Sequence, residues 1–110
     1  MISPKFVNIA REVVKFIRNG HKLTQRTIYF RNNISCPLGA VVVNHNGPVF
    51  CEGKYKFAYE KTGLSHYFQW GFDYHGESFP LDEEITNNED FIIGYKLAEM
   101  CANRNWIVYR

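Results

Sequence analysis

Apolar residues recur with a helical period close to the start of the chain. Between Ser3 and Gly20 they cover about half of a helical wheel, and Arg11, Lys15 and Arg18 gather on the opposite stripe. Ser3 is a favourable N-cap residue, and Gly20 stands where a left-handed residue ends many helices. The pattern therefore predicts a helix with one buried face and one basic face.

A second helical pattern near the end of the chain is apolar on nearly all sides. It begins at a capping-box sequence, residues 86–89, and extends to about Arg104. Gly94, Ala98 and Ala102 recur every four residues, so another element can approach this backbone closely. We expect this helix to be the central one.

Between the two helices the apolar period changes from 3.6 to 2, which is typical of strands. Asn46-Gly47 is a strong hairpin signal. The predicted strands are residues 27–31, 40–44, 49–51 and 54–60, with residues 106–109 as a closing strand. The chain of residues 1–110 is thus predicted to be a single globular α+β domain, in which a short antiparallel meander is covered on one face by the N-terminal and C-terminal helices.

Aromatic residues alternate with polar ones in residues 65–79. If this segment is extended, Phe68, Trp70, Phe72 and Tyr74 form one face. Such a face packs a helix onto a sheet in the interpretation that we favour. Stacking on nucleobases or sugar rings is the alternative.

Charge is distributed unevenly although the net charge is only +2. Residues 1–34 hold seven Lys or Arg and one Glu, whereas residues 77–90 hold six Asp or Glu and no Lys or Arg. The basic residues make nucleic-acid binding one alternative function. That basic set comprises Arg11, Lys15, Arg18, Lys22, Arg26 and Arg31.

The acidic residues exceed what a helix dipole can use, because its influence fades within the first helical turn. Carboxylates in excess would speed encounter with a basic protein partner. We therefore predict a protein-binding surface that combines these acids with neighbouring residues of the aromatic segment. The predicted set is Trp70, Asp73, Glu77, Asp82, Glu83 and Glu84.

Residues with chemical potential have better structural explanations. Asp73 before Gly76 suits a turn whose carboxylate accepts backbone N–H bonds. Cys36 precedes a proline with no cation or helix N-terminus beside it in the sequence, so a packed thiol is favoured over a nucleophile. The histidines and Cys51 lack the spacing of a metal site. No catalytic residue, metal ligand or cofactor is predicted, and an enzyme that depends on Cys and His remains a further alternative.

Four short motifs resemble a group of proteins found in bacteria and their phages. After the amphipathic first helix come Leu23-Thr-Gln25, Cys36-Pro-Leu-Gly-Ala40, Gly71-Phe-Asp73 and Gly94-Tyr-x-Leu97. The chain is similar in this order to short uncharacterised proteins. The resemblance implies a compact domain in which these residues are structural, and it implies no activity.

Amino-acid composition further narrows the class of protein to which this chain can belong. With 45% hydrophobic residues and 18 aromatic ones, a chain of 110 residues has enough apolar surface to form a core. The longest apolar stretch is far too short to span a membrane, and the N-terminus lacks the apolar centre of a secretory signal. Three cysteines without close pairing indicate reduced thiols and a cytoplasmic location. The favoured function is a small non-enzymatic protein-binding or regulatory protein, encoded by a phage or mobile element.

Overall fold

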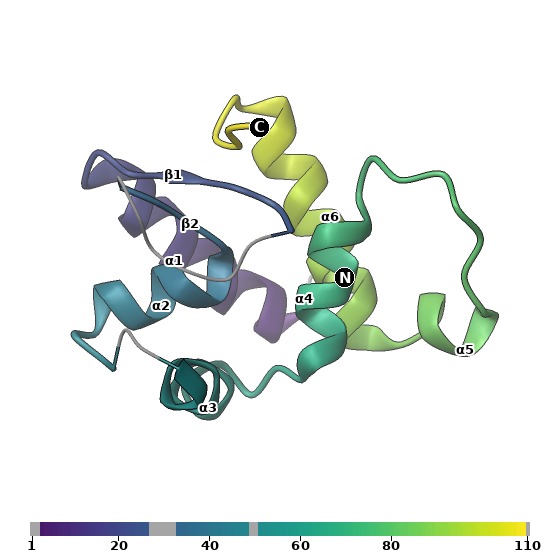
Figure 1. Cartoon of the computed structure of the whole chain (residues 1–110), viewed down its shortest axis with the longest axis horizontal. Helices are drawn as coiled ribbons and strands as arrows, with labels where there is room; N and C mark the ends of the chain where they lie inside the picture. Colours follow the sequence, from purple (N-terminus) through teal and green to yellow (C-terminus); the bar gives the residue numbers. More distant parts are fainter. Residues whose placement is uncertain (1–2, 27–32, 49–50, 110) are drawn as a thin grey trace.

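Helices make up most of the described chain, and the only sheet in that part has two very short strands. The computed structural model describes residues 3–26, 33–48 and 51–109. Figure 1 shows the elements in chain order. They are α1 (Pro4–Arg18), β1 (Lys22–Leu23), β2 (Ile34–Ser35), α2 (Pro37–Asn44), α3 (Cys51–Thr62), α4 (His66–Tyr74), α5 (Glu83–Thr86) and α6 (Glu89–Asn103).

The predicted first helix is confirmed at both ends. The Ser3 hydroxyl accepts a hydrogen bond from the Lys5 amide at 3.2 Å, so it caps the N-terminus of α1. Gly20 has φ +89°, and its amide donates to the Ile17 carbonyl at 3.0 Å. A left-handed glycine therefore ends the helix, as its sequence predicts.

The last helix is also confirmed, with a different cap. The Asn88 side chain accepts hydrogen bonds from the amides of Asp90 and Phe91 at 2.9 and 3.3 Å. Thr86 is the last residue of α5 and does not cap α6. The N-cap of α6 is thus Asn88, two residues after the Thr86 that the capping-box sequence predicts, because Asn is also a favourable N-cap residue.

The antiparallel meander is wrong. β1 and β2 pair in parallel, with Lys22 opposite Ile34 and Leu23 opposite Ser35. On the other side of β1, the Leu23 amide donates to the Trp106 carbonyl at 2.8 Å, and a single parallel bridge joins Leu23 to Ile107. The predicted closing strand is reduced to this bridge, and the strand predicted at residues 27–31 lies outside the described residues.

Residues 40–44 belong to helix α2, not to a strand. The run Leu38 to Val42 is fully or almost fully buried, and a short run buried on all sides has no period that separates helix from strand. Asn46-Gly47 ends this helix and forms no hairpin. Asn46 has φ +53°, and the Gly47 amide donates to the Val42 carbonyl at 2.9 Å, which is the bond of a Schellman motif.

Residues 54–60 belong to helix α3, so the strand predicted there is also wrong. Of the strand predicted at residues 49–51, residues 49–50 lie outside the described residues, and Cys51 begins α3. Tyr55, Ala58 and Tyr59 share one helical face, and the Ala58 side chain is completely buried. Tyr55 and Tyr59 are four residues apart, a separation that fits both a helical period and a period of two. The alternation in the sequence therefore concealed a helical face.

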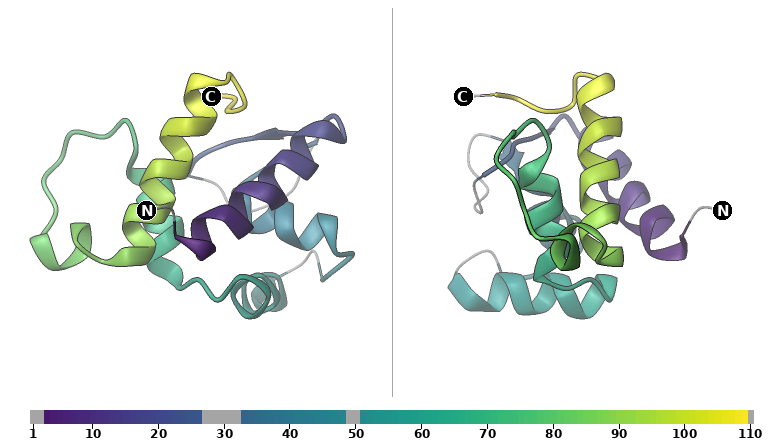
Figure 2. Two further views of the ribbon diagram at one scale, coloured as in Figure 1. Left: turned by 180° about the vertical axis from the view of Figure 1, so that it is seen from behind. Right: turned by 90° about the vertical axis from the view of Figure 1, so that its right-hand side faces the viewer.

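Residues 66–74 of the aromatic segment form helix α4, so the extended face predicted for this segment is wrong as well. Phe68 and Phe72, four residues apart, are completely buried and pack in the core. In Figure 2, α6 lies between α4 and α1. α2 packs on α1, and α3 packs on α2. The observed core is thus an assembly of helices that the small parallel sheet borders.

The segment between α4 and α6 projects from this assembly. Figures 1 and 2 show it as a long loop that carries α5 at the end of the molecule away from β1 and β2. The molecule measures 36 × 29 × 27 Å, with a radius of gyration of 12.9 Å. None of the helices described here has the length and apolar character needed to cross a membrane.

Candidate protein-binding surface

Aromatic side chains line one outward face of α4. Tyr67, Trp70 and Tyr74 are three and seven residues apart, so they share a helical face. The rings of Tyr67 and Trp70 are stacked, with their centroids 6.1 Å apart. Trp70 is 38% exposed, which is unusual for the largest apolar side chain.

This aromatic face continues onto the projecting loop and onto α6. The Tyr74 ring meets Phe79 edge to face at 5.1 Å, and its hydroxyl donates a hydrogen bond to the Phe79 carbonyl. The Tyr74 and Tyr95 rings lie 6.3 Å apart. Phe79 is 50% exposed and Tyr95 36%. We call Tyr67, Trp70, Tyr74, Phe79 and Tyr95 the aromatic row.

A cavity of about 300 Å³ opens beside the aromatic row. Tyr74 and Tyr95 form part of its lining, together with Thr86 at the end of α5. Phe91, Ile92 and Lys96 complete the lining. An apolar side chain of another molecule could enter here, next to rings that are already partly exposed.

Acidic residues follow the aromatic row directly. We call residues 77–88, which include α5, the acidic arm. Asp82, Glu83 and Glu84 are exposed, and within the described ranges no Lys or Arg forms an ion pair with them. Asp82 is the N-cap residue of α5, but its carboxylate makes no capping hydrogen bond. These three carboxylates are therefore open to a basic partner.

Glu77 differs from the other acids of the arm. Its carboxylate lies 2.7 Å from Nε of Arg26, in an ion pair that ties the start of the arm to the segment after β1. Arg26 also donates to the His75 carbonyl at 3.2 Å. Glu77 thus holds the start of the arm in place, whereas the exposed carboxylates of Asp82, Glu83 and Glu84 follow later in the arm.

Asp73 is half-buried and has a structural role. Its carboxylate accepts hydrogen bonds from the Arg26 amide at 2.9 Å and from the Gln69 side chain at 3.0 Å. Burial raises the pKa of the Asp73 carboxyl, and these two hydrogen bonds oppose the rise. The predicted backbone N–H bond to Asp73 exists, but its donor lies far away in the sequence, and Asp73 is in a helix instead of a turn.

The predicted basic residues have different environments. Arg11, Lys15 and Arg18 are exposed on α1 and line a groove of about 550 Å³. Lys22 donates to the Asn105 carbonyl at 3.2 Å. Arg26 is engaged with Glu77, and Arg31 lies outside the described residues.

The structure corrects the expectation that no helix N-terminus lies beside Cys36. Cys36 is the N-cap residue of α2, and its sulfur accepts a hydrogen bond from the Gly39 amide at 3.4 Å. A helix N-terminus therefore does lie beside this thiol, although the sequence pattern indicated none. The side chain is nevertheless completely buried. Among the residues that the structure describes, no cluster of His, Cys, Asp or Glu could hold a metal ion.

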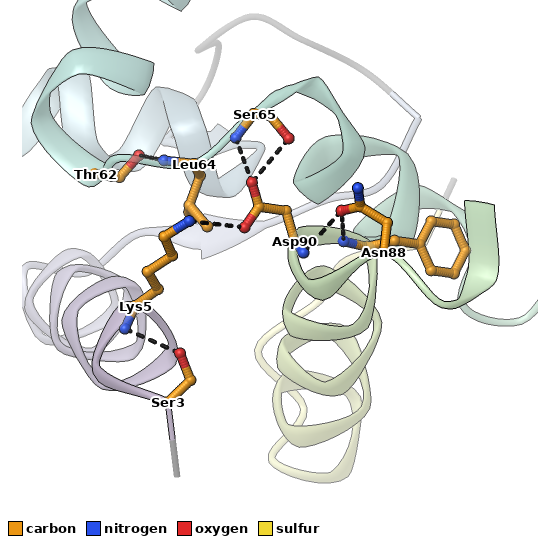
Figure 3. A network of polar contacts seen from close by, with 8 residues as sticks. Ser3, Lys5, Thr62, Leu64, Ser65, Asn88 and Asp90 are labelled. Carbon is orange, nitrogen blue, oxygen red and sulfur yellow. Dashed lines mark hydrogen bonds and ion pairs between the residues drawn. The ribbon is translucent and has the colours of Figure 1, made fainter. Parts of the chain in front are cut away.

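A buried carboxylate fixes the helices that carry the aromatic row. Asp90, in the first turn of α6, accepts hydrogen bonds from the amide and the hydroxyl of Ser65, both at 2.8 Å, where α4 begins. Its other oxygen lies 3.3 Å from Nζ of Lys5 on α1 (Figure 3). One carboxylate therefore joins α1, α4 and α6. Sequence analysis missed it, because nothing in the spacing relates Ser65 to Asp90.

Sequence analysis also missed four members of the aromatic row. Trp70 was among the predicted binding residues, whereas Tyr67, Tyr74, Phe79 and Tyr95 were not. The helical spacing of Tyr67, Trp70 and Tyr74 was a usable signal, but the extended interpretation of this segment concealed it.

Comparisons of this chain with protein-family models, with curated proteins and with solved structures found no match.

Proposed function

We propose that this protein is a small non-enzymatic binding protein that recognises a basic protein partner through the aromatic row and the acidic arm. The observation that carries the proposal is the adjacency of two kinds of exposed group. Partly exposed rings extend from Trp70 to Phe79, and three carboxylates without a cationic partner in the described chain follow them. Aromatic anchors beside complementary charge are typical of protein interfaces.

The two parts of this surface have different roles. Burial of the Trp70 and Phe79 rings supplies most of the affinity, because large aromatic side chains dominate interface energetics. The carboxylates of Asp82, Glu83 and Glu84 accelerate encounter and exclude acidic competitors. The partner is thus a protein with a basic surface and at least one apolar side chain that fits beside Tyr74 and Tyr95.

Nucleic-acid binding has less support. Three of the six predicted cations remain available in one groove, but aliphatic side chains such as Val7 and Val14 line that groove beside them. The aromatic row, which could stack on bases, is bordered by acids that would repel phosphate. An enzyme that depends on Cys36 has less support as well, because a completely buried thiol is inaccessible to a substrate.

We also infer that binding takes place in a cytoplasm, where free thiols remain reduced. Cys36 and Cys101 are both buried. A binding protein of this size, without chemistry of its own, would act as a regulator that occupies a surface of its partner. The origin in a phage or mobile element belongs to the same proposal and rests on the motif resemblance.

Affinity capture from a native lysate, followed by mass spectrometry, tests this proposal. The informative variant is Glu83→Gln with Glu84→Gln, and the matched control is Glu60→Gln with Glu99→Gln, which makes the same change in net charge at exposed positions on α3 and α6. We expect the arm variant to capture the partner several-fold more slowly, with the difference disappearing at high salt. The control variant should capture it at the wild-type rate.

A second variant separates the contribution of the aromatic rings to affinity from the contribution of the carboxylates to the rate of association. Trp70→Ala should accelerate dissociation of the same partner while leaving the salt dependence of association intact. If both variants bind like the wild type, the aromatic row and the acidic arm are not the binding surface. If capture depends on Arg11, Lys15 and Arg18 and is abolished by nuclease, the protein binds nucleic acid instead.

A further inference from the structure

The apolar face of α1 is wider than the core that covers it. Ile9, Val13 and Phe16 are completely buried. Phe6, Val7, Ala10 and Val14 lie next to them around the helix and are only half-buried, and they line the groove of about 550 Å³. The α1 groove therefore has an apolar floor that no described part of the chain covers.

Cations form the rim of the α1 groove. Arg11, Lys15 and Arg18 lie along it, and within the described ranges none of them forms an ion pair with a carboxylate. Lys5, by contrast, is engaged with Asp90. A ligand of this groove must therefore combine apolar side chains with negative charge.

The acidic arm of the same protein has this composition. Asp82, Glu83 and Glu84 are exposed, Phe79 is 50% exposed, and Leu81 and Ile85 are half-buried. Within the described part of the chain, the arm carries three carboxylates without an ion pair, and the groove carries three cations without one. Apolar side chains accompany the charges on both surfaces.

The acids of the arm and the cations of the groove lie on different parts of the molecule, although Phe6 at the start of the groove and Asn87 at the end of the arm line a common cavity. Figure 2 shows α5 at one end of the molecule and the C-terminal half of α1 toward the other. The ion pair of Glu77 with Arg26 and the hydrogen bond from Tyr74 to Phe79 also hold the base of the arm against α4 and the segment after β1. The part of the arm that carries Asp82, Glu83 and Glu84 is thus directed away from the C-terminal half of α1 in the same molecule.

We propose that the acidic arm of one copy binds in the α1 groove of a second copy. Each contact joins different surfaces of the two copies. Two such contacts related by a two-fold axis form a closed reciprocal dimer, whereas contacts that are not reciprocated form a ring or an open chain. This contact rests on the proposed function, since it names a partner for the same arm. Self-association would also limit access of any other basic partner to the arm.

A charge-exchange experiment tests this contact. Sedimentation velocity of the purified wild-type protein, at increasing concentration and low ionic strength, should show larger species that dissociate at high salt. The groove variant Arg11→Glu, Lys15→Glu, Arg18→Glu should have an association constant reduced about tenfold or more, because like charges then face each other. The arm variant Asp82→Lys, Glu83→Lys, Glu84→Lys should behave in the same way.

The mixture of the two variants provides the decisive sample. The acidic groove of the groove variant then faces the basic arm of the arm variant. The natural acidic arm of the groove variant likewise faces the natural basic groove of the arm variant. Mixing should therefore restore association. Circular dichroism confirms that each variant folds. If a reversal variant fails to fold, the neutral set Arg11→Gln, Lys15→Gln, Arg18→Gln replaces it, with loss of salt-sensitive association as the readout.

A wild-type protein that stays monomeric at all concentrations overturns the inference, and so does a mixture that remains monomeric. Its failure is distinct from failure of the proposed function. Capture of another protein that depends on Glu83 and Glu84 would leave the proposed function intact, whatever the wild-type protein does alone.

Discussion

Gly71 on α4 and Gly94 on α6 each lie against the backbone of the other helix. A Cβ atom on Gly71 would lie 2.0 Å from the carbonyl oxygen of Phe91, and a Cβ atom on Gly94 would lie 2.0 Å from that of Phe68. Neither distance is possible for a real side chain, so the two glycines permit the close crossing of the helices. This crossing places Tyr74 beside Tyr95 and so builds part of the aromatic row.

Gly94→Ala tests the crossing. Alanine favours an isolated helix by about 1 kcal/mol over glycine, but the added methyl group must displace the Phe68 carbonyl. We expect the steric term to dominate and the free energy of unfolding to fall by about 1–3 kcal/mol in a denaturant titration. The exposed Glu99→Ala on the same helix serves as the control and should change stability by less than about 0.5 kcal/mol. A Gly94→Ala protein that is more stable than the wild type would contradict the crossing.

Asp90→Ala tests the network that joins α1, α4 and α6. The substitution leaves the Ser65 amide and hydroxyl without their acceptor, so we expect a loss of about 2–3 kcal/mol in the free energy of unfolding. Lys5→Met removes only the partly exposed ion pair and should cost less than about 1 kcal/mol. Equal losses for the two variants in the same denaturant titration would show that the Ser65 bonds contribute little.

Asp73→Asn tests a pH effect. Burial raises the pKa of this carboxyl above its usual 3.8, so the folded state holds the proton more tightly than the unfolded state. The stability from this proton is therefore fully present below the unfolded pKa and is lost as pH rises through the folded pKa. Because the variant cannot titrate at this position, the wild-type free energy of unfolding minus that of the variant should decrease from about pH 3 to neutrality. Denaturant titrations across this range measure it, and a difference that grows with pH would contradict the raised pKa.

Cys101 should be inert in the folded protein. Burial raises the pKa of its thiol to about 12, although the nearby Arg104 opposes the rise, so almost no thiolate forms at neutral pH. We expect alkylation at Cys101, mapped by mass spectrometry, only when denaturant unfolds the chain. Full labelling in denaturant is the control, and rapid labelling under native conditions would place Cys101 outside the core.

The sequence predicted the two long helices because their ends carry specific residues. Ser3 and Gly20 define α1 through local hydrogen bonds, which a sequence pattern can indicate directly. The small residues of α6 likewise indicated a close approach, which Gly94 makes to Phe68. These signals are local, and so the sequence suffices to locate them.

The middle of the chain was misinterpreted because its patterns are ambiguous. Asn46-Gly47 suits a hairpin and a helix C-terminus equally well, since both need a residue with positive φ. The apolar run in α2 has no period, and the spacing of Tyr55 and Tyr59 fits two periods. Tertiary burial decided all three cases, and a single sequence does not contain that information.

The candidate site was predicted in part. Trp70 and the acids at residues 82–84 are exposed in the structure, whereas Glu77 and Asp73 are engaged through Arg26. That engagement joins residues about fifty positions apart, so no spacing in the sequence could reveal it. Charge counts identified a surplus of carboxylates, and only the tertiary structure showed which of them is paired.

Oxidative footprinting of the protein with its captured partner tests the central claim most directly. The control is within the chain, because Tyr109 is 62% exposed and belongs to neither the aromatic row nor the acidic arm. We predict that Trp70, Phe79 and Tyr95 become protected from oxidation in the complex while Tyr109 reacts as it does in the free protein. Unchanged oxidation of Trp70 and Phe79 in a complex that protects Tyr109 or α1 would contradict the account.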